Sequence, residues 1–208
     1  SGWWNLTVWD GHSPRAFLKE ELDHAEAAWQ FGYSAYGFLC DGSLVLGSDP
    51  VNPATLRRFG KGGKELSGLG SGHSTARYVT TIDERVIYVG ASPTSLPEIV
   101  SVHSVTGICS VLKRSNDLEL DPDEISIPCA ITFPTTDNAE AHGVYYPQHN
   151  SQVDASDKEK PPLLVITHGG PTSEAGSELS LRVQFWTSRG FAVVDVNYRG
   201  STGHGRAY

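Results

Sequence analysis

Apolar residues between positions 3 and 127 fall in short runs that are separated by turn residues. Little in this stretch repeats at the three-to-four-residue spacing of a helix, so the pattern predicts an all-β architecture. Strands at this density are typical of a sandwich, a barrel or a propeller, and the pattern alone leaves these open. Residues 60–72 are rich in glycine but match no phosphate-binding loop or dinucleotide fingerprint, so we interpret them as a mobile loop.

Two hairpins are predicted within this all-β stretch. Asp41-Gly42 separates two apolar runs, and this dipeptide accepts the positive φ angles that a tight two-residue turn requires. The second hairpin is predicted over residues 98–112, with its turn at Thr106-Gly107 and a further strand over residues 85–89 before it.

The pattern changes near residue 161. Residues 148–160 are polar and charged, which indicates an exposed connection. Residues 163–167 and 191–196 are then continuous apolar runs, the kind of strand that is covered on both faces of a parallel sheet. An α/β sheet is therefore predicted to begin here.

A helix is predicted between these two strands, over residues 178–189. Leu179, Val183 and Trp186 would share one side of it, and Gly190 stands where a helix ends in left-handed geometry. The result is one strand-helix-strand crossover of the right-handed kind.

Composition and charge narrow the classes of partner. Of 208 residues, 38% are hydrophobic, as in ordinary globular proteins. With 16 Lys+Arg against 24 Asp+Glu the net charge is -8 and no basic run is present, so a nucleic-acid partner is not expected. No apolar stretch approaches the roughly 20 residues of a bilayer span, so no membrane partner is expected. The chain begins at Ser1 and contains no Met, from which we expect an internal fragment of a longer protein.

Cysteine and histidine spacing predicts no metal site. The odd number of cysteines, Cys40, Cys109 and Cys129, suits neither a zinc site nor a disulfide framework, and we expect buried free thiols in a reducing, cytoplasmic compartment. The eight histidines lack HExxH spacing, so neither a metal nor a cofactor is expected.

Candidate chemistry follows the two predicted parallel strands. His168-Gly169-Gly170-Pro171 comes directly after the first strand, at the carboxyl end, where open parallel sheets place their ligand sites. Such a loop can direct amide N–H groups at a small negative group, as the oxyanion loop of α/β-hydrolases does. For an isolated His-Gly-Gly, the alternative is a plain turn with His168 bonded to neighbouring backbone.

The second strand is followed by Asn197-Tyr198-Arg199-Gly200-Ser201, which would open on the same side of the sheet. Together the two loops and the helix between them resemble the acylaminoacyl-peptidase and dipeptidyl-aminopeptidase branch of the prolyl oligopeptidase family. Upstream segments are similar too, among them Gly2-Trp3-Trp4-Asn5-Leu6 and Phe133-Pro134-Thr135-Thr136.

The resemblance implies a β-propeller portion, all-β, followed by the start of an α/β-hydrolase domain. Residues 1–127 would be the C-terminal part of the propeller, and residues 128–208 the N-terminal part of the peptidase domain. It further implies that Gly169 and Gly170 contribute oxyanion-hole backbone. His168 takes the place where some relatives have a tyrosine that contacts the oxyanion, and Arg199 is implied as a substrate-binding residue at the rim.

None of the catalytic triad is expected in this chain. The family's serine lies on a Gly-Xaa-Ser-Xaa-Gly elbow after the next strand, followed by the aspartate and the histidine. The sequence contains no such elbow, and Ser201 stands one residue early in its glycine context. The chain by itself is therefore predicted to be inactive.

The parent protein is predicted to be a serine-type peptidase that hydrolyses short peptides or acyl-peptides through an acyl-serine intermediate. Two alternatives stay open: an esterase or lipase of the same superfamily, and a non-catalytic propeller scaffold with a degenerate hydrolase domain. A homo-oligomer of the full-length enzyme is also left open.

Overall fold

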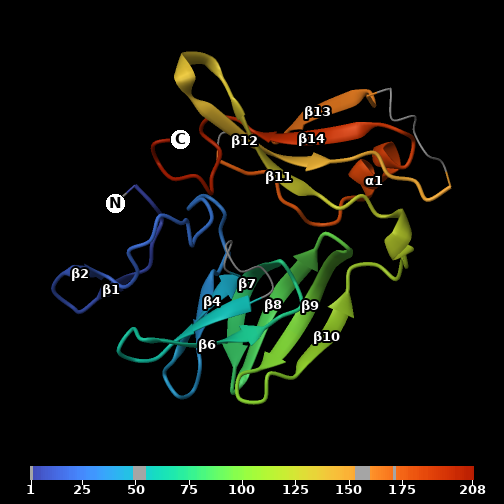
Figure 1. Cartoon of the computed structure of the whole chain (residues 1–208). Coiled ribbons are helices and arrows are strands. Elements are labelled where there is room, and N and C mark those ends of the chain that lie inside the picture. Colours follow the sequence, from blue (N-terminus) through green and yellow to red (C-terminus); the bar gives the residue numbers. More distant parts are fainter. Residues whose placement is uncertain (1, 49–54, 153–159, 171) are drawn as a thin grey trace. The chain divides into compact units, whose positions relative to one another are not determined.

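The computed structural model describes residues 2–48, 55–152, 160–170 and 172–208 (Figure 1). Residues 153–159 of the predicted connection and Pro171 of the candidate loop lie outside the described residues. Two compact units are present, the first formed by residues 1–92, 97–115 and 202–208, and the second by residues 93–96 and 116–201. The domain boundary predicted between residues 127 and 128 stays a prediction.

The first unit contains two four-stranded antiparallel sheets whose strands follow one another in chain order. This up-and-down order is that of propeller blades. A two-stranded ribbon precedes them. The ribbon consists of β1 (Thr7–Trp9) and β2 (Pro14–Ala16), the first sheet of β3 (Tyr36–Phe38), β4 (Leu44–Ser48), β5 (Thr55–Phe59) and β6 (Glu65–Gly70), and the second sheet of β7 (Thr75–Ile82), β8 (Arg85–Ser92), β9 (Ser95–His103) and β10 (Cys109–Arg114).

The two four-stranded sheets share one hydrophobic core. Period-2 alternation drives this packing, because every second side chain of a strand points to the same face. In β8, for example, Val86 and Tyr88 are buried while Arg85 is exposed. The shared cluster takes Leu39, Val45, Leu56 and Leu69 from the first sheet and its connections, and Ala76, Val79, Val86, Tyr88, Val100 and Val102 from the second.

Both predicted hairpins are present, but the turn at Asp41-Gly42 differs from the prediction. The Leu39 N–H donates to the Ser43 carbonyl at 2.9 Å and the Gly42 N–H to the Leu39 carbonyl at 2.8 Å, so the loop has three residues rather than two. Gly42 alone takes a positive φ, 78°, as in three-residue hairpin loops that end in a left-handed residue. The second hairpin, β9–β10, and the strand β8 before it form as predicted.

The glycine-rich segment 60–72 is not a continuous loop, which corrects the prediction. Strand β6 runs through it and pairs with β5. Glycine lowers strand propensity, yet pairing with an established neighbouring strand overrides that local preference.

The second unit holds a mixed sheet in the order β11-β12-β14-β13 (Figure 1). Strands β13 and β14 are parallel and β12 pairs with β14 antiparallel, so the predicted α/β crossover is confirmed. The elements are the short 3₁₀ turns η1 (Pro122–Glu124) and η2 (Thr136–Asn138), strands β11 (Cys129–Pro134), β12 (Glu140–Tyr146), β13 (Leu163–Thr167) and β14 (Ala192–Asn197), and helix α1 (Leu181–Thr187).

Helix α1 is shorter than predicted and turns a different face inward. It begins after Ser180, whose backbone is extended and whose hydroxyl accepts a hydrogen bond from the Val183 N–H. Gly190 follows the helix with the expected positive φ of 87°. Val183 is buried as predicted, but Trp186 is 38% exposed and Gln184 is buried instead. None of the helices in the described part of the chain is both long and apolar enough to span a bilayer.

Strand β13 is covered on one face rather than on two. Leu164 and Ile166 pack against the cluster that includes Val183 of α1, whereas Leu163 is 54% and Val165 is 61% exposed. The prediction that β13 is covered on both faces is therefore wrong, because α1 covers only the face of Leu164 and Ile166. Strand β13 is also the edge strand of the described sheet.

Candidate functional site

The candidate loops start at the same edge of the second unit's sheet. The register of β13 and β14 runs from Leu163 opposite Ala192 to Thr167 opposite Val196. Since parallel strands end on the same side, the loop that begins at His168 and the loop that begins at Tyr198 leave the sheet together. The sequence-based expectation that these loops open on one side is confirmed.

Gly169 and Gly170 are both exposed at this edge. Among the residues that the structure describes, none accepts a hydrogen bond from either amide. A Cβ on Gly170 would lie 2.6 Å from the Tyr198 Oη, whereas a Cβ on Gly169 would meet nothing within 4 Å. The Tyr198 side chain thus leaves no room for a side chain at the second glycine.

His168 is held between its own loop and the neighbouring one. Its Nδ1 lies 2.8 Å from the Gly169 carbonyl oxygen, and its Nε2 lies 2.8 Å from the Ser201 Oγ. The imidazole stacks on the Tyr198 ring with centroids 4.4 Å apart and planes 23° from parallel. Contact with neighbouring backbone, the alternative weighed for an isolated His-Gly-Gly, is therefore only part of what His168 does.

The second loop closes on itself in a tight turn. The Ser201 N–H donates to the Tyr198 carbonyl at 2.9 Å, and Gly200 supplies the positive φ, 97°, that the third position of a type II turn needs. The Ser201 hydroxyl lies 2.6 Å from the same carbonyl and is enclosed, with the residue 3% exposed. The Tyr198 Oη donates to the His168 carbonyl at 3.3 Å and so joins the two loops.

Two charged residues accompany the loops. Burial raises the pKa of the Asp195 carboxyl, near the end of β14, against the opposing effect of the His168 and Arg182 charges. Its Oδ1 has no hydrogen-bond partner among the described residues. Arg199, the predicted substrate-binding residue, is exposed at the turn and forms no ion pair within the described ranges.

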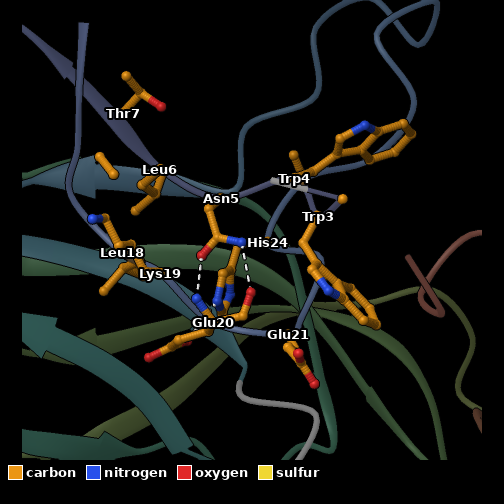
Figure 2. Close-up of a pocket in the computed structure, with 13 residues that line it drawn as sticks. Trp3, Trp4, Asn5, Leu6, Thr7, Leu18, Lys19, Glu20, Glu21 and His24 are labelled. Atoms are coloured by element: carbon orange, nitrogen blue, oxygen red, sulfur yellow. Dashed lines mark hydrogen bonds and ion pairs between the residues drawn. The ribbon is translucent and has the colours of Figure 1, made fainter. Parts of the chain in front are cut away.

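A separate hollow of about 800 Å³ lies in the first unit (Figure 2). The lining residue Glu20 is bonded on two sides: Arg57, which does not line the hollow, donates to both of its oxygens at 2.7 and 2.9 Å, and the His24 Nε2 lies 2.8 Å from it. The Asn5 side-chain amide donates to the carbonyls of Glu20 and Leu22. Because these groups satisfy each other, we interpret the hollow as a structural feature rather than a binding site.

The cysteines differ from the prediction, since Cys40, Cys109 and Cys129 are free but all exposed. Burial was expected because cysteine is usually a small core residue. Here Cys109 and Cys129 lie in β10 and β11, the outermost strands of their sheets, where little covers them. Within the described ranges, no group of three or more His, Cys, Asp or Glu side chains is placed to hold a metal ion.

Sequence reasoning placed His168, Gly169 and Gly170 on one loop and Arg199 on the other, and the structure puts them at one sheet edge. It did not anticipate the contacts of Tyr198 and Ser201 with the first loop, nor the partly buried carboxyl of Asp195 in β14. Only the predicted topology could have indicated these contacts, because the loops that follow neighbouring parallel strands lie next to each other at one edge of the sheet.

Comparisons with known proteins find peptidases among the relatives of this chain. The model of the prolyl oligopeptidase family matches residues 177–208. The acylamino-acid-releasing enzyme of Mus musculus is 46% identical over 50 residues, 24% of this chain and 7% of that enzyme. Dipeptidyl aminopeptidase BIII of Pseudoxanthomonas mexicana is 40% identical over 47 residues, 23% of this chain and 7% of that enzyme.

A solved puromycin-hydrolysing peptidase of Mycobacterium tuberculosis matches with a TM-score of 0.91 and 30% identity, over 100% of this chain and 32% of that one. The chain thus spans about a third of that structure and a small part of the curated relatives. With the strand orders above, these likenesses identify a β-propeller portion followed by the start of an α/β-hydrolase domain. The chain is therefore similar to peptidases of the prolyl oligopeptidase family, whose model matches its residues 177–208.

Proposed function

We propose that this chain is part of a serine-type peptidase that hydrolyses short peptides or acyl-peptides through an acyl-serine intermediate. The observation that carries the proposal is the pair of exposed amides at Gly169 and Gly170, at the carboxyl edge of a parallel strand pair. The catalytic serine, aspartate and histidine would come from residues that follow Tyr208 in a longer protein. The share of the related peptidase that the chain covers, 32%, supports that arrangement.

The chemistry follows from the charge that develops during acyl transfer. Attack on a carbonyl converts its oxygen into an oxyanion, and fixed N–H donors stabilise that charge without reorganising. Loss of one such donor costs about 3 to 4 kcal/mol of transition-state stabilisation in other enzymes. Gly169 and Gly170 would supply donors to this oxyanion, and the exposed guanidinium of Arg199 would contact the substrate at the rim.

The substrate class rests on what the relatives are named for. One releases acylated amino acids, one is a dipeptidyl aminopeptidase and one hydrolyses puromycin. A simple esterase is the weaker candidate, because two blade-like sheets precede the hydrolase-type sheet. A scaffold with a degenerate hydrolase domain would differ from a peptidase in residues after Tyr208, where the catalytic triad of the peptidase is proposed to lie.

The test is to express the full reading frame that contains this chain and to treat it with a fluorophosphonate probe. We expect labelling of one serine downstream of Tyr208 and hydrolysis of acyl-amino-acid or dipeptide chromogenic substrates. The 208-residue chain serves as the control and should show neither. A full-length protein without labelling or turnover would contradict the peptidase, and hydrolysis of simple esters alone would favour the esterase.

A further inference from the structure

We propose that Tyr198 and Ser201 are positioning residues that orient the two amides of the His168-Gly169-Gly170 loop, an inference that rests on the proposed oxyanion role of that loop. Neither residue would touch the substrate. They act from the neighbouring loop: Tyr198 through a hydrogen bond to the His168 carbonyl, and Ser201 through a contact with the His168 ring.

The peptide bond is planar, so its carbonyl and its amide move together. In a trans peptide unit the C=O of one residue and the N–H of the next lie in one plane and point in opposite directions. A hydrogen bond that holds the carbonyl of His168 therefore also aims the N–H of Gly169. In the same way, a hydrogen bond to the carbonyl of Gly169 aims the N–H of Gly170.

Both carbonyls are held by side chains. The Tyr198 Oη donates to the His168 carbonyl at 3.3 Å, which sets the first peptide plane. The His168 Nδ1 lies 2.8 Å from the Gly169 carbonyl oxygen, which sets the second. Because a carbonyl oxygen only accepts, a hydrogen bond at this distance requires a proton on Nδ1.

The orientation of the imidazole depends in turn on Ser201. The Ser201 Oγ lies 2.8 Å from Nε2, within hydrogen-bond distance, and donates its own proton to the Tyr198 carbonyl at 2.6 Å. The Ser201 hydroxyl is buried and belongs to a turn closed by its own backbone N–H, so it is a fixed point. Stacking on Tyr198 at 4.4 Å restrains the plane of the same ring.

The second loop is thus built as a support for the first. Asn197, the last residue of β14, accepts a hydrogen bond from the Ala175 N–H at 2.7 Å and ties the loop to the segment before α1. From this base, Tyr198 governs the Gly169 amide and Ser201, through His168, governs the Gly170 amide. This division assigns a separate role to each residue.

The kinetic test uses Tyr198→Phe and Ser201→Ala in the full-length enzyme. Each variant should lower kcat at least about tenfold while KM changes little, because a misplaced donor weakens the transition state more than the bound substrate. Ser180→Ala is the matched control, since it removes the hydroxyl that caps α1 and should lower Tm without lowering kcat. Values of kcat within twofold of wild type for both loop variants would overturn the inference.

A second readout does not depend on activity. ¹⁵N NMR of histidine-labelled 208-residue chain should show His168 protonated at Nδ1, and Ser201→Ala should change the Nε2 signal while Ser180→Ala leaves it unchanged. A ring protonated only at Nε2 would refute the arrangement. If the NMR pattern holds and the wild-type full-length protein shows no serine-dependent turnover, the proposed function fails while the loop support stands.

Discussion

Gly170 shows at the scale of one residue why a motif needs its glycine. Its backbone φ is not in the left-handed region, so conformation alone does not demand glycine. What excludes a side chain is the Tyr198 Oη, 2.6 Å from the position of a Cβ, while the next atom of that ring is 3.7 Å away. Gly169, its neighbour in the same motif, has open space there.

This contrast predicts a double-mutant cycle. Gly170→Ala should reduce the free energy of unfolding by about 1 kcal/mol, because Tyr198 must move from its stacked position. In a Tyr198→Phe background the clash is absent, so the same substitution should cost clearly less. Chemical denaturation of the four proteins measures this, with Gly169→Ala as the control that changes little. Additive losses would contradict the steric account.

Glu20 is the second residue whose surroundings decide its behaviour. Hydrogen bonds from Arg57, assisted by His24, lower the pKa of the Glu20 carboxyl to about 2 from 4.5, against the effect of burial. A carboxyl with a depressed folded-state pKa contributes stability that is fully present above its unfolded pKa and is lost as pH falls through the folded one.

We therefore predict that Glu20→Gln lowers the free energy of unfolding by about 2 kcal/mol at pH 7. The difference from wild type should shrink between pH 4.5 and pH 2, where the wild-type carboxyl takes up its proton. Denaturation at several pH values tests this. Glu21→Gln makes the same charge change at an exposed neighbour and should show no such trend. A difference that stays constant down to pH 2 would refute the assignment.

At the scale of elements, the Gln184 side chain of helix α1 bonds to the backbone of Ser126, as a neighbouring strand would. The Ser126 N–H donates to the Gln184 Oε1 at 2.8 Å, and the Gln184 Nε2 donates to the Ser126 carbonyl at 3.1 Å. Both residues are buried, so the segment that leads into β11 has its backbone groups satisfied by the helix. The helical spacing from Leu179 and Val183 predicts Trp186 on the buried side, and gives no reason to expect a buried glutamine, because glutamine is mostly exposed.

Gln184→Leu should therefore cost about 2 to 3 kcal/mol, since it leaves a buried donor and a buried acceptor without partners. The same change at the exposed Gln152 is the control and should stay within about 0.5 kcal/mol. Thermal or chemical unfolding of both variants measures the two changes in the free energy of unfolding. A stable Gln184→Leu protein would mean that water or another group replaces both bonds.

At the scale of the whole chain, apolar surface and unpaired strand edges coincide at β13. It is an edge strand of its sheet, and its exposed face carries Leu163 and Val165. Edge strands with apolar side chains are templates for pairing with another copy. The isolated 208-residue chain is therefore expected to self-associate.

Val165→Lys places a charge on that exposed face and should reduce self-association, as measured by light scattering, without loss of secondary structure. Ile166→Lys makes the same change one residue later, on the face packed against the core, and should unfold the sheet. Equal light scattering by wild type and Val165→Lys would exclude β13 as the contact.

Local pattern was sufficient for the two hairpins, for the strand-helix-strand crossover and for the family resemblance. Period-2 alternation, the turn glycines and the two apolar runs at 163–167 and 191–196 are local, and the structure has the corresponding strands in parallel pairing. The His-Gly-Gly loop and its partner were recognisable because their residue types stand directly after those strands.

Tertiary structure alone decided which atoms meet. The Gly170–Tyr198 approach, the Ser201–His168 hydrogen bond and the Gln184–Ser126 pair join residues 28 to 58 positions apart, and no periodicity encodes them. The same holds for burial, since Leu163 and Val165 are exposed on the face of β13 that α1 does not cover, and Cys109 and Cys129 lie in the outermost strands of their sheets. A chain specifies its strands through neighbouring residues, but contacts and exposure depend on how the elements pack.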